Sequence, residues 1–180
     1  MRDDVMKTLI TAEELQARVK EIGEQITKDY AGKMPVLVCV LKGSLVFMAD
    51  LMRHVDLYAE VDTMAVSSYG SGTVSSGVVR LVKDLNNSIE GRDVIIIEDI
   101  LDSGKTLAYI RDMFETRNPA SIAICTLLDK PNRRVVDIAA DYVGFTIPDE
   151  FVIGYGLDFD EKYRNLPFVG VLKPSVYTGE

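Results

Sequence analysis

Residues 94–106 read Val94-Ile95-Ile96-Ile97-Glu98-Asp99-Ile100-Leu101-Asp102-Ser103-Gly104-Lys105-Thr106. The apolar run at the start is typical of a strand that is buried on both faces of a parallel sheet. The carboxylates of Glu98, Asp99 and Asp102 follow, and a glycine turn leads into a helix. We therefore predict a strand, a turn and a helix, with three carboxylates where the strand ends.

Strands and helices are predicted to alternate on both sides of this stretch. Thr11 and Glu14 form a capping box that begins a helix, and Gly32 marks its end. The strand at 94–97, the helix after it and a strand at 121–128 form a right-handed βαβ unit, which requires a parallel sheet. The sequence thus predicts an α/β protein, without internal repeats or an interdomain linker. Further strands are expected at 36–41, 59–66 and 78–85, and a short helix at 45–55.

A long loop separates two of the predicted strands. Residues 67–77 are all Ser, Gly or Thr except Tyr69 and Val74. A hairpin connection usually takes two to five residues, so this loop is too long for a simple turn. Its composition indicates either a mobile lid or a disordered tip, and the residues alone do not separate the two.

Composition and charge exclude several classes of protein. The chain has 180 residues and a formal net charge of −8, and an isoelectric point of about 4.7 argues against nonspecific nucleic-acid binding. Its apolar runs are far shorter than the ~18 residues of a membrane span, and its acidic start leads into no signal-peptide core. Cys39 and Cys125 lie in strand-like runs, so we expect two buried free thiols in a reducing cytoplasm.

The turn at 102–106 has the features of an anion site. Gly104 allows close approach of the backbone, and the free N–H groups of residues 103–106 add to the positive end of the helix dipole. Open α/β sheets bind ligands at this edge. An anion site beside three carboxylates indicates a ligand that has both phosphate and hydroxyl or metal-bound groups, and a phosphorylated sugar fits.

Two nucleotide-binding motifs fail at these positions. A P-loop needs a glycine five residues before Gly104, where Asp99 stands. Gly70 and Gly72 begin a dinucleotide fingerprint, but Ser75 occupies the place of its third glycine, and no helix follows.

Residues 98–106 resemble the phosphoribosyl-pyrophosphate motif of type I phosphoribosyltransferases. Three further stretches narrow the resemblance to the hypoxanthine (hypoxanthine-guanine) phosphoribosyltransferase family, and together they cover nearly the whole chain. They are residues 41–44, the pair Ser68-Tyr69, and a C-terminal set of Lys130, Phe151, Val152, Asp158 and Arg164.

The resemblance implies an α/β fold with a twisted, mostly parallel sheet flanked by helices and a small hood formed by the terminal segments. A single domain would span 1–180, with a lid at about 67–77 and base-binding hood segments at about 1–15 and 145–175. The family implies Mg²⁺ as cofactor and a homodimer or homotetramer in the cytoplasm, with no nucleic-acid or membrane partner. It also implies a cis peptide between Leu41 and Lys42.

The implied reaction is purine salvage. The 5-phosphoribosyl group would move from phosphoribosyl pyrophosphate to hypoxanthine, and to guanine, giving IMP or GMP and pyrophosphate. Asp102 would be the general base. Glu98 and Asp99 would hold the ribose hydroxyls and, through water, one Mg²⁺. Asp102, Ser103, Gly104, Lys105 and Thr106 would bind the 5′-phosphate, and Lys42, Gly43 and Arg164 would bind the pyrophosphate.

The resemblance also assigns a purine site and a lid. Lys130 would donate to the 6-oxo group, which adenine lacks, and Phe151 would stack on the purine beside Val152. Asp158 would contact a second Mg²⁺ and the 2-position of the base. Ser68 and Tyr69 would open the lid, and Tyr69 would be its only large side chain.

Each of these residues also has an ordinary structural interpretation. Lys42 alone would be a solvated loop lysine, Arg164 half of a surface ion pair, and Phe151 a core aromatic. Lys130 would be an exposed turn lysine, and Asp158 a turn acid. Three other functions compete: a regulatory relative that binds RNA, a transferase for a pyrimidine, and an interaction protein. The negative charge disfavours the first, Lys130 with Phe151 the second, and the strand-end carboxylates the third.

Overall fold

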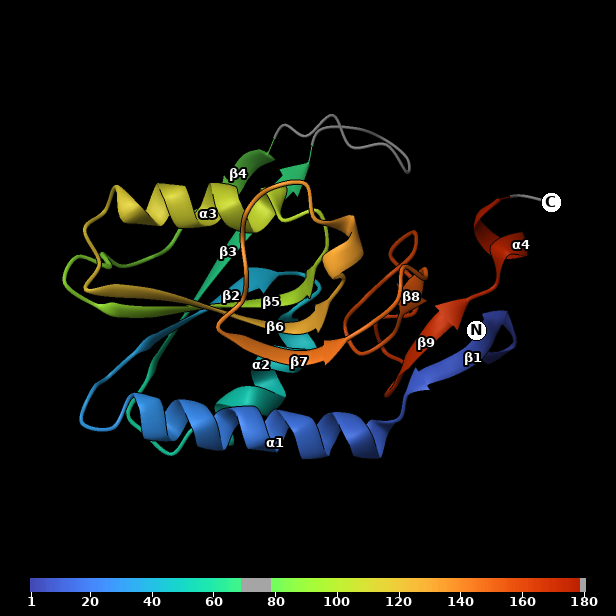
Figure 1. The fold of residues 1–180 in the computed structure, drawn as a ribbon, viewed down its shortest axis with the longest axis horizontal. Coiled ribbons are helices and arrows are strands. Elements are labelled where there is room, and N and C mark those ends of the chain that lie inside the picture. Colours follow the sequence, from blue (N-terminus) through green and yellow to red (C-terminus); the bar gives the residue numbers. More distant parts are fainter. Residues whose placement is uncertain (69–78, 179–180) are drawn as a thin grey trace.

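The computed structural model describes residues 1–68 and 79–178 of the chain (Figure 1). Its strands form a six-stranded sheet and a separate three-stranded sheet. In chain order the elements are a 3-10 turn (Arg2–Asp4), β1 (Val5–Ile10), α1 (Ala12–Asp29), β2 (Val36–Leu41), α2 (Leu45–Met52), β3 (Glu60–Ser68), β4 (Val79–Lys83), β5 (Asp93–Leu101), α3 (Lys105–Glu115), β6 (Ser121–Asp129), a second 3-10 turn (Pro131–Arg133), β7 (Tyr142–Thr146), β8 (Val152–Ile153), β9 (Val169–Leu172) and α4 (Pro174–Tyr177).

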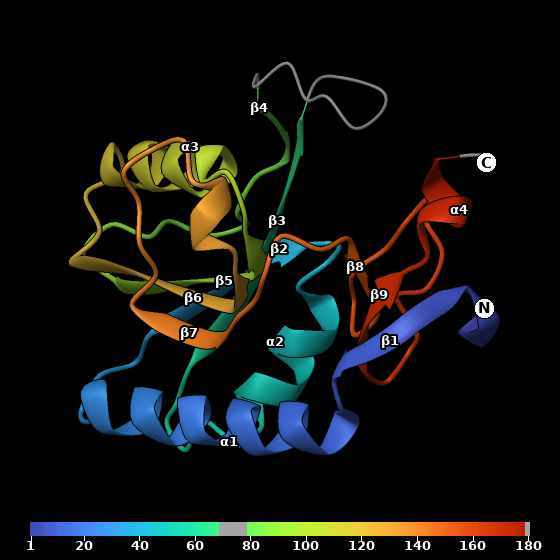
Figure 2. The same ribbon diagram turned by 45° about the vertical axis from the view of Figure 1, so that its right-hand side comes forward.

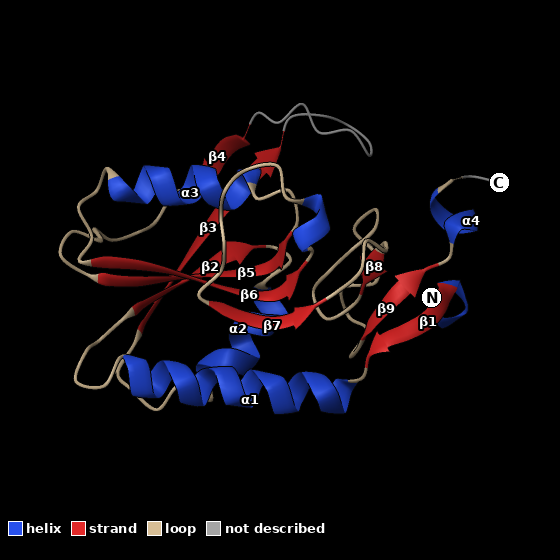
Figure 3. Cartoon of the chain, in the orientation of Figure 1, coloured by secondary structure: helices blue, strands red, loops and turns tan. Residues whose placement is uncertain are grey.

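The larger sheet confirms the predicted α/β fold. Its order is β4-β3-β2-β5-β6-β7, and every neighbouring pair is parallel except β3 and β4. Helix α3 covers one face, while α1 and α2 cover the other (Figures 1 and 3). Strands β5 and β6 are parallel and joined by α3, as the βαβ unit requires.

Alternating side chains of the central strands build a core on each face of the sheet. In β2 and β5, Leu37 and Ile95 pack with the buried faces of α1 and α2. Val38 and Ile96, one position later, pack with Leu107, Ile110 and Phe114 of α3. Because both faces are covered, these strands consist of continuous apolar runs, which is why their sequences show no polar alternation.

The order of the strands reverses between β2 and β5. From β2 the chain proceeds through α2 to β3 on one side, and from β5 it proceeds through α3 to β6 on the other. At such a switch point the two connections leave the sheet in opposite directions, which opens a crevice beyond the carboxyl ends of the two strands. The segments at this crevice are residues 42–44 and residues 102–104.

The three-stranded sheet joins the two ends of the chain beside the main body (Figure 2). Its order is β1-β9-β8, and both pairs are antiparallel. A loop from the same region approaches the main body, because a Cβ on Gly156 would stand only 2.1 Å from Gly43 O. The hood implied by the resemblance is therefore a small sheet. Its implied first segment, about 1–15, includes the start of α1 at Ala12, but this helix packs against the larger sheet.

Several local predictions are confirmed. Thr11 and Glu14 form both hydrogen bonds of the capping box, and β2 has the predicted bounds. Cys39 and Cys125 are buried and free. The peptide between Leu41 and Lys42 is cis. None of the helices in the described ranges has the length and apolar character that crossing a bilayer requires.

Other predictions need correction. Strand β5 continues to Leu101, so Glu98 and Asp99 lie within it, because their neighbours in β6 extend the pairing. Helix α2 ends at Met52. No element was predicted after residue 173, yet Pro174–Tyr177 form α4. Ser67 and Ser68 of the predicted lid end β3, whereas Tyr69 and the rest of that loop lie outside the described residues.

Candidate active site

Two adjacent carboxylates occupy the last part of β5. Glu98 is only 8% exposed, and its Oε1 accepts the backbone N–H of Asp99 at 3.0 Å. Asp99 Oδ1 in turn accepts the N–H of Ile100 at 2.6 Å. Burial raises the pKa of both carboxyls, and the charge of Asp99 raises the pKa of Glu98 further. A cation or a hydrogen-bond donor from a ligand would therefore bind here with favourable energy.

The turn after β5 leads into the N-terminus of α3, where the sequence predicts an anion site. Gly104 is the N-cap of α3 and has a left-handed φ of 85°. A Cβ there would also stand 2.5 Å from Ile138 Cγ2, so the position requires glycine for two reasons. The first helical bond runs from Ala108 N–H to Gly104 O at 2.9 Å, and the N–H groups before it have no partner within the helix. Gly104 offers no side chain to the cap, but the neighbouring Ser103 Oγ accepts the N–H of Lys105 at 3.4 Å.

The loop after β2 lies directly against the β5 carboxylates. A Cβ on Gly43 would stand 1.6 Å from Asp99 Oδ2, so only glycine allows this contact. The neighbouring Lys42 side chain is 66% exposed, and its Nζ lies 3.1 Å from Glu161 Oε2. The predicted pyrophosphate loop and the predicted ribose carboxylates therefore share one surface.

Arg164 reaches the same place from the segment between β8 and β9. Its NH2 group lies 2.9 Å from Asp158 Oδ1, and its NH1 group donates to Gly156 O at 2.8 Å. Its Nε is buried and has no hydrogen-bond partner among the described residues. Arg164 does form an ion pair, as its ordinary structural interpretation holds, but the side chain is only 26% exposed and lines the crevice instead of the outer surface.

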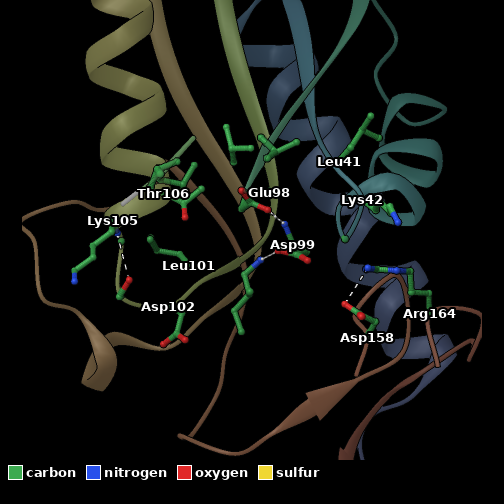
Figure 4. Close-up of a pocket in the computed structure, with 18 residues that line it drawn as sticks. Leu41, Lys42, Glu98, Asp99, Leu101, Asp102, Lys105, Thr106, Asp158 and Arg164 are labelled. Carbon is green, nitrogen blue, oxygen red and sulfur yellow. Dashed lines mark hydrogen bonds and ion pairs between the residues drawn. The ribbon is translucent and has the colours of Figure 1, made fainter. Parts of the chain in front are cut away.

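These groups line one cleft of about 470 Å³ at the switch point. Figure 4 shows Lys105 and Thr106 on one side, Glu98 and Asp99 in the middle, and Lys42 and Arg164 on the other side. The cleft thus has the N-terminus of α3 at one end, two cationic side chains at the other and carboxylates between them. The predicted residues that line it are Lys42, Gly43, Glu98, Asp99, Asp102, Ser103, Gly104, Lys105, Thr106, Asp158 and Arg164.

Three predicted purine contacts lie outside this cleft lining. Lys130 is 8% exposed and donates from Nζ to Glu150 O at 2.7 Å, so it is not an exposed turn lysine. Val152 is buried. One face of the Phe151 ring is stacked on Tyr177, with centroids 4.9 Å apart, so a purine can stack only on the opposite face.

Comparison with known proteins identifies the family to which the chain belongs. A sequence model of the phosphoribosyl transferase domain matches residues 7–160. The chain is also 59% identical over 177 residues to a hypoxanthine-guanine phosphoribosyltransferase of Streptococcus thermophilus, covering 98% of both chains. This chain belongs to the hypoxanthine-guanine phosphoribosyltransferase family.

Further relatives in this family cover the same length. A hypoxanthine-guanine phosphoribosyltransferase of Bacillus subtilis is 58% identical over 177 residues, which is 98% of both chains. The crystal structure of a hypoxanthine phosphoribosyltransferase from Staphylococcus aureus superposes with a TM-score of 0.94 at 55% identity, over 98% of this chain and 96% of that one. The fold is therefore the type I phosphoribosyltransferase fold, and the protein is a transferase of purine salvage.

Sequence reasoning missed several groups around this phosphoribosyltransferase cleft. Arg133 Nε donates to Asp102 Oδ1 at 3.2 Å, and its NH1 group lies 3.7 Å from Asp149 Oδ2. Asp149 Oδ1 lies 3.7 Å from Lys130 Nζ, so ion pairs connect the candidate general base to the candidate purine lysine. Arg134 supports the turn by donating to Asp102 O at 3.1 Å. In the sequence, the only sign of these contacts is the pair Arg133-Arg134, which follows Lys130 closely.

The donor set fits the Mg²⁺ that this family uses. In residues 1–68 and 79–178, no three or more His, Cys, Asp or Glu side chains are placed to hold a metal by themselves. Magnesium, however, is commonly bound through one or two carboxylates together with waters and substrate phosphates. The buried pair Glu98 and Asp99, whose charges burial disfavours, and the separate Asp158 in the same cleft, meet that requirement.

Proposed function

We propose that this protein transfers the 5-phosphoribosyl group from phosphoribosyl pyrophosphate to hypoxanthine and guanine. The products would be IMP or GMP together with pyrophosphate. One observation carries this proposal: the cleft has an N–H cradle at one end, cations at the other and two carboxylates between them. That order matches a 5′-phosphate, a ribose and a pyrophosphate along one ligand.

The chain's own residues would bind each part of this ligand. Residues 102–106 bind the 5′-phosphate through their N–H groups, and Glu98 with Asp99 accepts the ribose hydroxyls. Lys42, Gly43 and Arg164 bind the pyrophosphate. Because the leaving group gains charge as the glycosidic bond breaks, cations at this end stabilise the transition state more than the ground state.

Bound Mg²⁺ would neutralise charge on the pyrophosphate and help to orient it. Glu98 and Asp99 would hold one ion through water, and Asp158 a second. In the reaction, the bond between the anomeric carbon and pyrophosphate breaks while a purine ring nitrogen bonds to that carbon. Asp102 takes the proton that this nitrogen loses.

Base selection would depend on Lys130. Its ammonium group has three hydrogens, and Glu150 O accepts one of them. The remaining donors suit the 6-oxo group of hypoxanthine or guanine, whereas the 6-amino group of adenine offers no acceptor. A site built around such a bond can reject the wrong analogue by roughly 10⁴-fold. Phe151 stacks on the base beside Val152, and Asp158 is near its 2-position.

A product assay tests the function. The protein is mixed with phosphoribosyl pyrophosphate, Mg²⁺ and, separately, hypoxanthine, guanine, xanthine, adenine or uracil. Nucleotide should form with hypoxanthine and guanine, but not with adenine or uracil. Asp102→Asn should lower kcat by about 10²–10⁴-fold. Asp112→Asn, on the exposed side of α3, makes the same charge change and should leave kcat unaltered. Comparable rates with adenine, or no product with any base, would refute the proposal.

We also infer a reducing cytoplasm and an oligomer. The buried free thiols Cys39 and Cys125 suit a reducing compartment. Large apolar side chains on and after α2 are exposed, which supports an interface between copies, in keeping with the homodimer or homotetramer that the family implies. Sedimentation at several concentrations would test this; a monomer throughout would contradict it. The exposed side chains are Leu45, Met52, Tyr58 and Val61.

A further inference from the structure

Glu161 lies between the two cations at the pyrophosphate end of the cleft. Its Oε2 atom is 3.1 Å from Lys42 Nζ and 3.5 Å from Arg164 NH2. Lys42 comes from the loop after β2, whereas Arg164 comes from the segment before β9, so the two cations are far apart in sequence. One carboxylate oxygen therefore joins the two groups that the proposed function assigns to pyrophosphate.

The turn that carries Glu161 is built in an unusual backbone conformation. Asp160, Glu161 and Tyr163 have φ values of 52°, 59° and 78°, in the left-handed region that residues other than glycine seldom occupy. Asp158 Oδ2 accepts the N–H of Glu161 at 2.9 Å, and this bond holds the turn. Because the bond uses the backbone of Glu161, it does not depend on the Glu161 side chain.

Arg164 does not need Glu161 to keep its position. Its NH2 group is closer to Asp158 Oδ1, at 2.9 Å, and its NH1 group donates to Gly156 O. The side chain of Glu161 is 66% exposed, as is that of Lys42, so the pair between them can open without a rearrangement of the core. Glu161 therefore contributes negative charge at this place more than it contributes structure.

We infer that Glu161 is an internal anion that competes with pyrophosphate for Lys42 and Arg164. This inference rests on the proposed function, because it takes both cations to be pyrophosphate ligands. Phosphoribosyl pyrophosphate must displace the Glu161 carboxylate when it binds, and the carboxylate returns to the cations when pyrophosphate leaves. Glu161 thus weakens the binding of the substrate's pyrophosphate group and of the product, and it speeds product release.

The variant Glu161→Gln removes this charge and retains the backbone bond to Asp158. The inhibition constant of inorganic pyrophosphate should fall by about two- to five-fold, the range that an exposed ion pair supports. The KM for phosphoribosyl pyrophosphate should also fall. Both effects should diminish at high salt, because salt screens exposed charges. If Glu161 merely positioned the cations, its loss would raise both constants.

Asp160→Asn is the matched control. Asp160 lies in the same turn, also has a positive φ, and pairs with Lys162 rather than with the cleft cations. The substitution Asp160→Asn removes one negative charge at nearly the same place, so an effect of net charge alone would appear in both variants. An unchanged or higher pyrophosphate constant in Glu161→Gln, or an equal decrease in Asp160→Asn, would overturn the inference.

Titration calorimetry with magnesium pyrophosphate separates this inference from the proposed function. A wild-type protein that makes no nucleotide would refute the proposed function. Tighter pyrophosphate binding by Glu161→Gln than by wild type would support the competing anion, whatever the turnover. If wild type is active but wild type and Glu161→Gln bind pyrophosphate equally, the inference is refuted and the proposed function stands.

Discussion

Asp99 Oδ2 occupies the space in which a side chain on Gly43 would begin, 1.6 Å from the position of a Cβ. The loop after β2 and the carboxylates of β5 are thus in direct contact across the switch point. Neither strand alone forms the cleft, because the 42–44 loop and the carboxylates of Glu98 and Asp99 come from different strands. Their contact depends on the absence of a side chain at position 43.

Replacing Gly43 tests this contact. In Gly43→Ala the new methyl group must displace the Asp99 carboxylate or the 42–44 loop, and displacement by about 1 Å can cost roughly 10²-fold in rate. We expect kcat/KM for phosphoribosyl pyrophosphate to fall at least tenfold while the protein stays folded by circular dichroism. Gly32→Ala is the control for backbone strain outside the cleft: a Cβ there meets nothing within 4 Å, but its φ of 76° is left-handed, so the variant should lose some stability and keep wild-type kinetics. Wild-type kinetics in Gly43→Ala would contradict the contact.

Lys130 should control which base is accepted. Lys130→Met removes a charged donor, whose hydrogen bond contributes about 1.5–3 kcal/mol, so kcat/KM for hypoxanthine should fall by about 10–150-fold. The KM for phosphoribosyl pyrophosphate should change little, because Lys130 lies outside the cleft lining. Kinetics with both substrates measure this, with the exposed Lys20→Met as control. Equal losses for the two substrates would indicate general damage instead.

Asp50 of α2 forms a hydrogen bond with Tyr155, whose neighbour Gly156 lies against Gly43. Its Oδ2 atom accepts hydrogen bonds from Tyr155 OH at 2.5 Å and Gln16 Nε2 at 2.9 Å. Burial acts to raise the pKa of Asp50, but the hydrogen bonds from Tyr155, Gln16 and Arg53 outweigh it and lower the pKa. The ionised carboxylate therefore stabilises the fold above the ordinary Asp range, and this stability is lost as the pH falls through the lowered pKa.

Asp50→Asn should consequently be destabilised in a pH-dependent way. At pH 7 we expect the free energy of unfolding to decrease by about 1–3 kcal/mol, because the hydrogen bonds to a charged acceptor are weakened. The difference should shrink as the pH falls below the ordinary Asp value of about 3.9 and through the lowered pKa of Asp50, where the wild-type carboxyl also becomes protonated. Urea unfolding at pH 7 and at a series of pH values from about 4 down to about 2 measures this change. A difference that is constant with pH would show that the charge of Asp50 is unimportant.

The C-terminal helix should support the purine site through Tyr177. Its ring stacks on Phe151 at 4.9 Å and 20°, and such pairs contribute about 0.5–1.5 kcal/mol. Tyr177→Ala should therefore raise the KM for hypoxanthine by about 2–10-fold, with little effect on the KM for phosphoribosyl pyrophosphate. Tyr177→Phe retains the ring and should behave as wild type. If both variants raise the KM, the hydroxyl and not the stacking is responsible.

Much of the fold was predictable because its signals are local. The capping box at Thr11 and the bounds of β2 depend only on residues close in sequence. The extension of β5 through Glu98 and Asp99 was not predictable, since it depends on pairing with β6, in which Glu98 lies opposite Thr126. Helix α4 was missed for the same reason: its Tyr177 packs on Phe151, which is distant in sequence.

The sequence by itself determined the helices and strands from α1 to β6, the glycine turn that begins α3 and the resemblance that identified the family. These depend on periodicity, glycine positions and residue spacing along one stretch of chain. Only the tertiary structure decided that Gly43 contacts Asp99, that Arg133 contacts Asp102 and that Glu161 joins Lys42 to Arg164. Those contacts exist because the strand order reverses between β2 and β5 and a distant turn closes over the crevice, and distance along the chain does not reveal either arrangement.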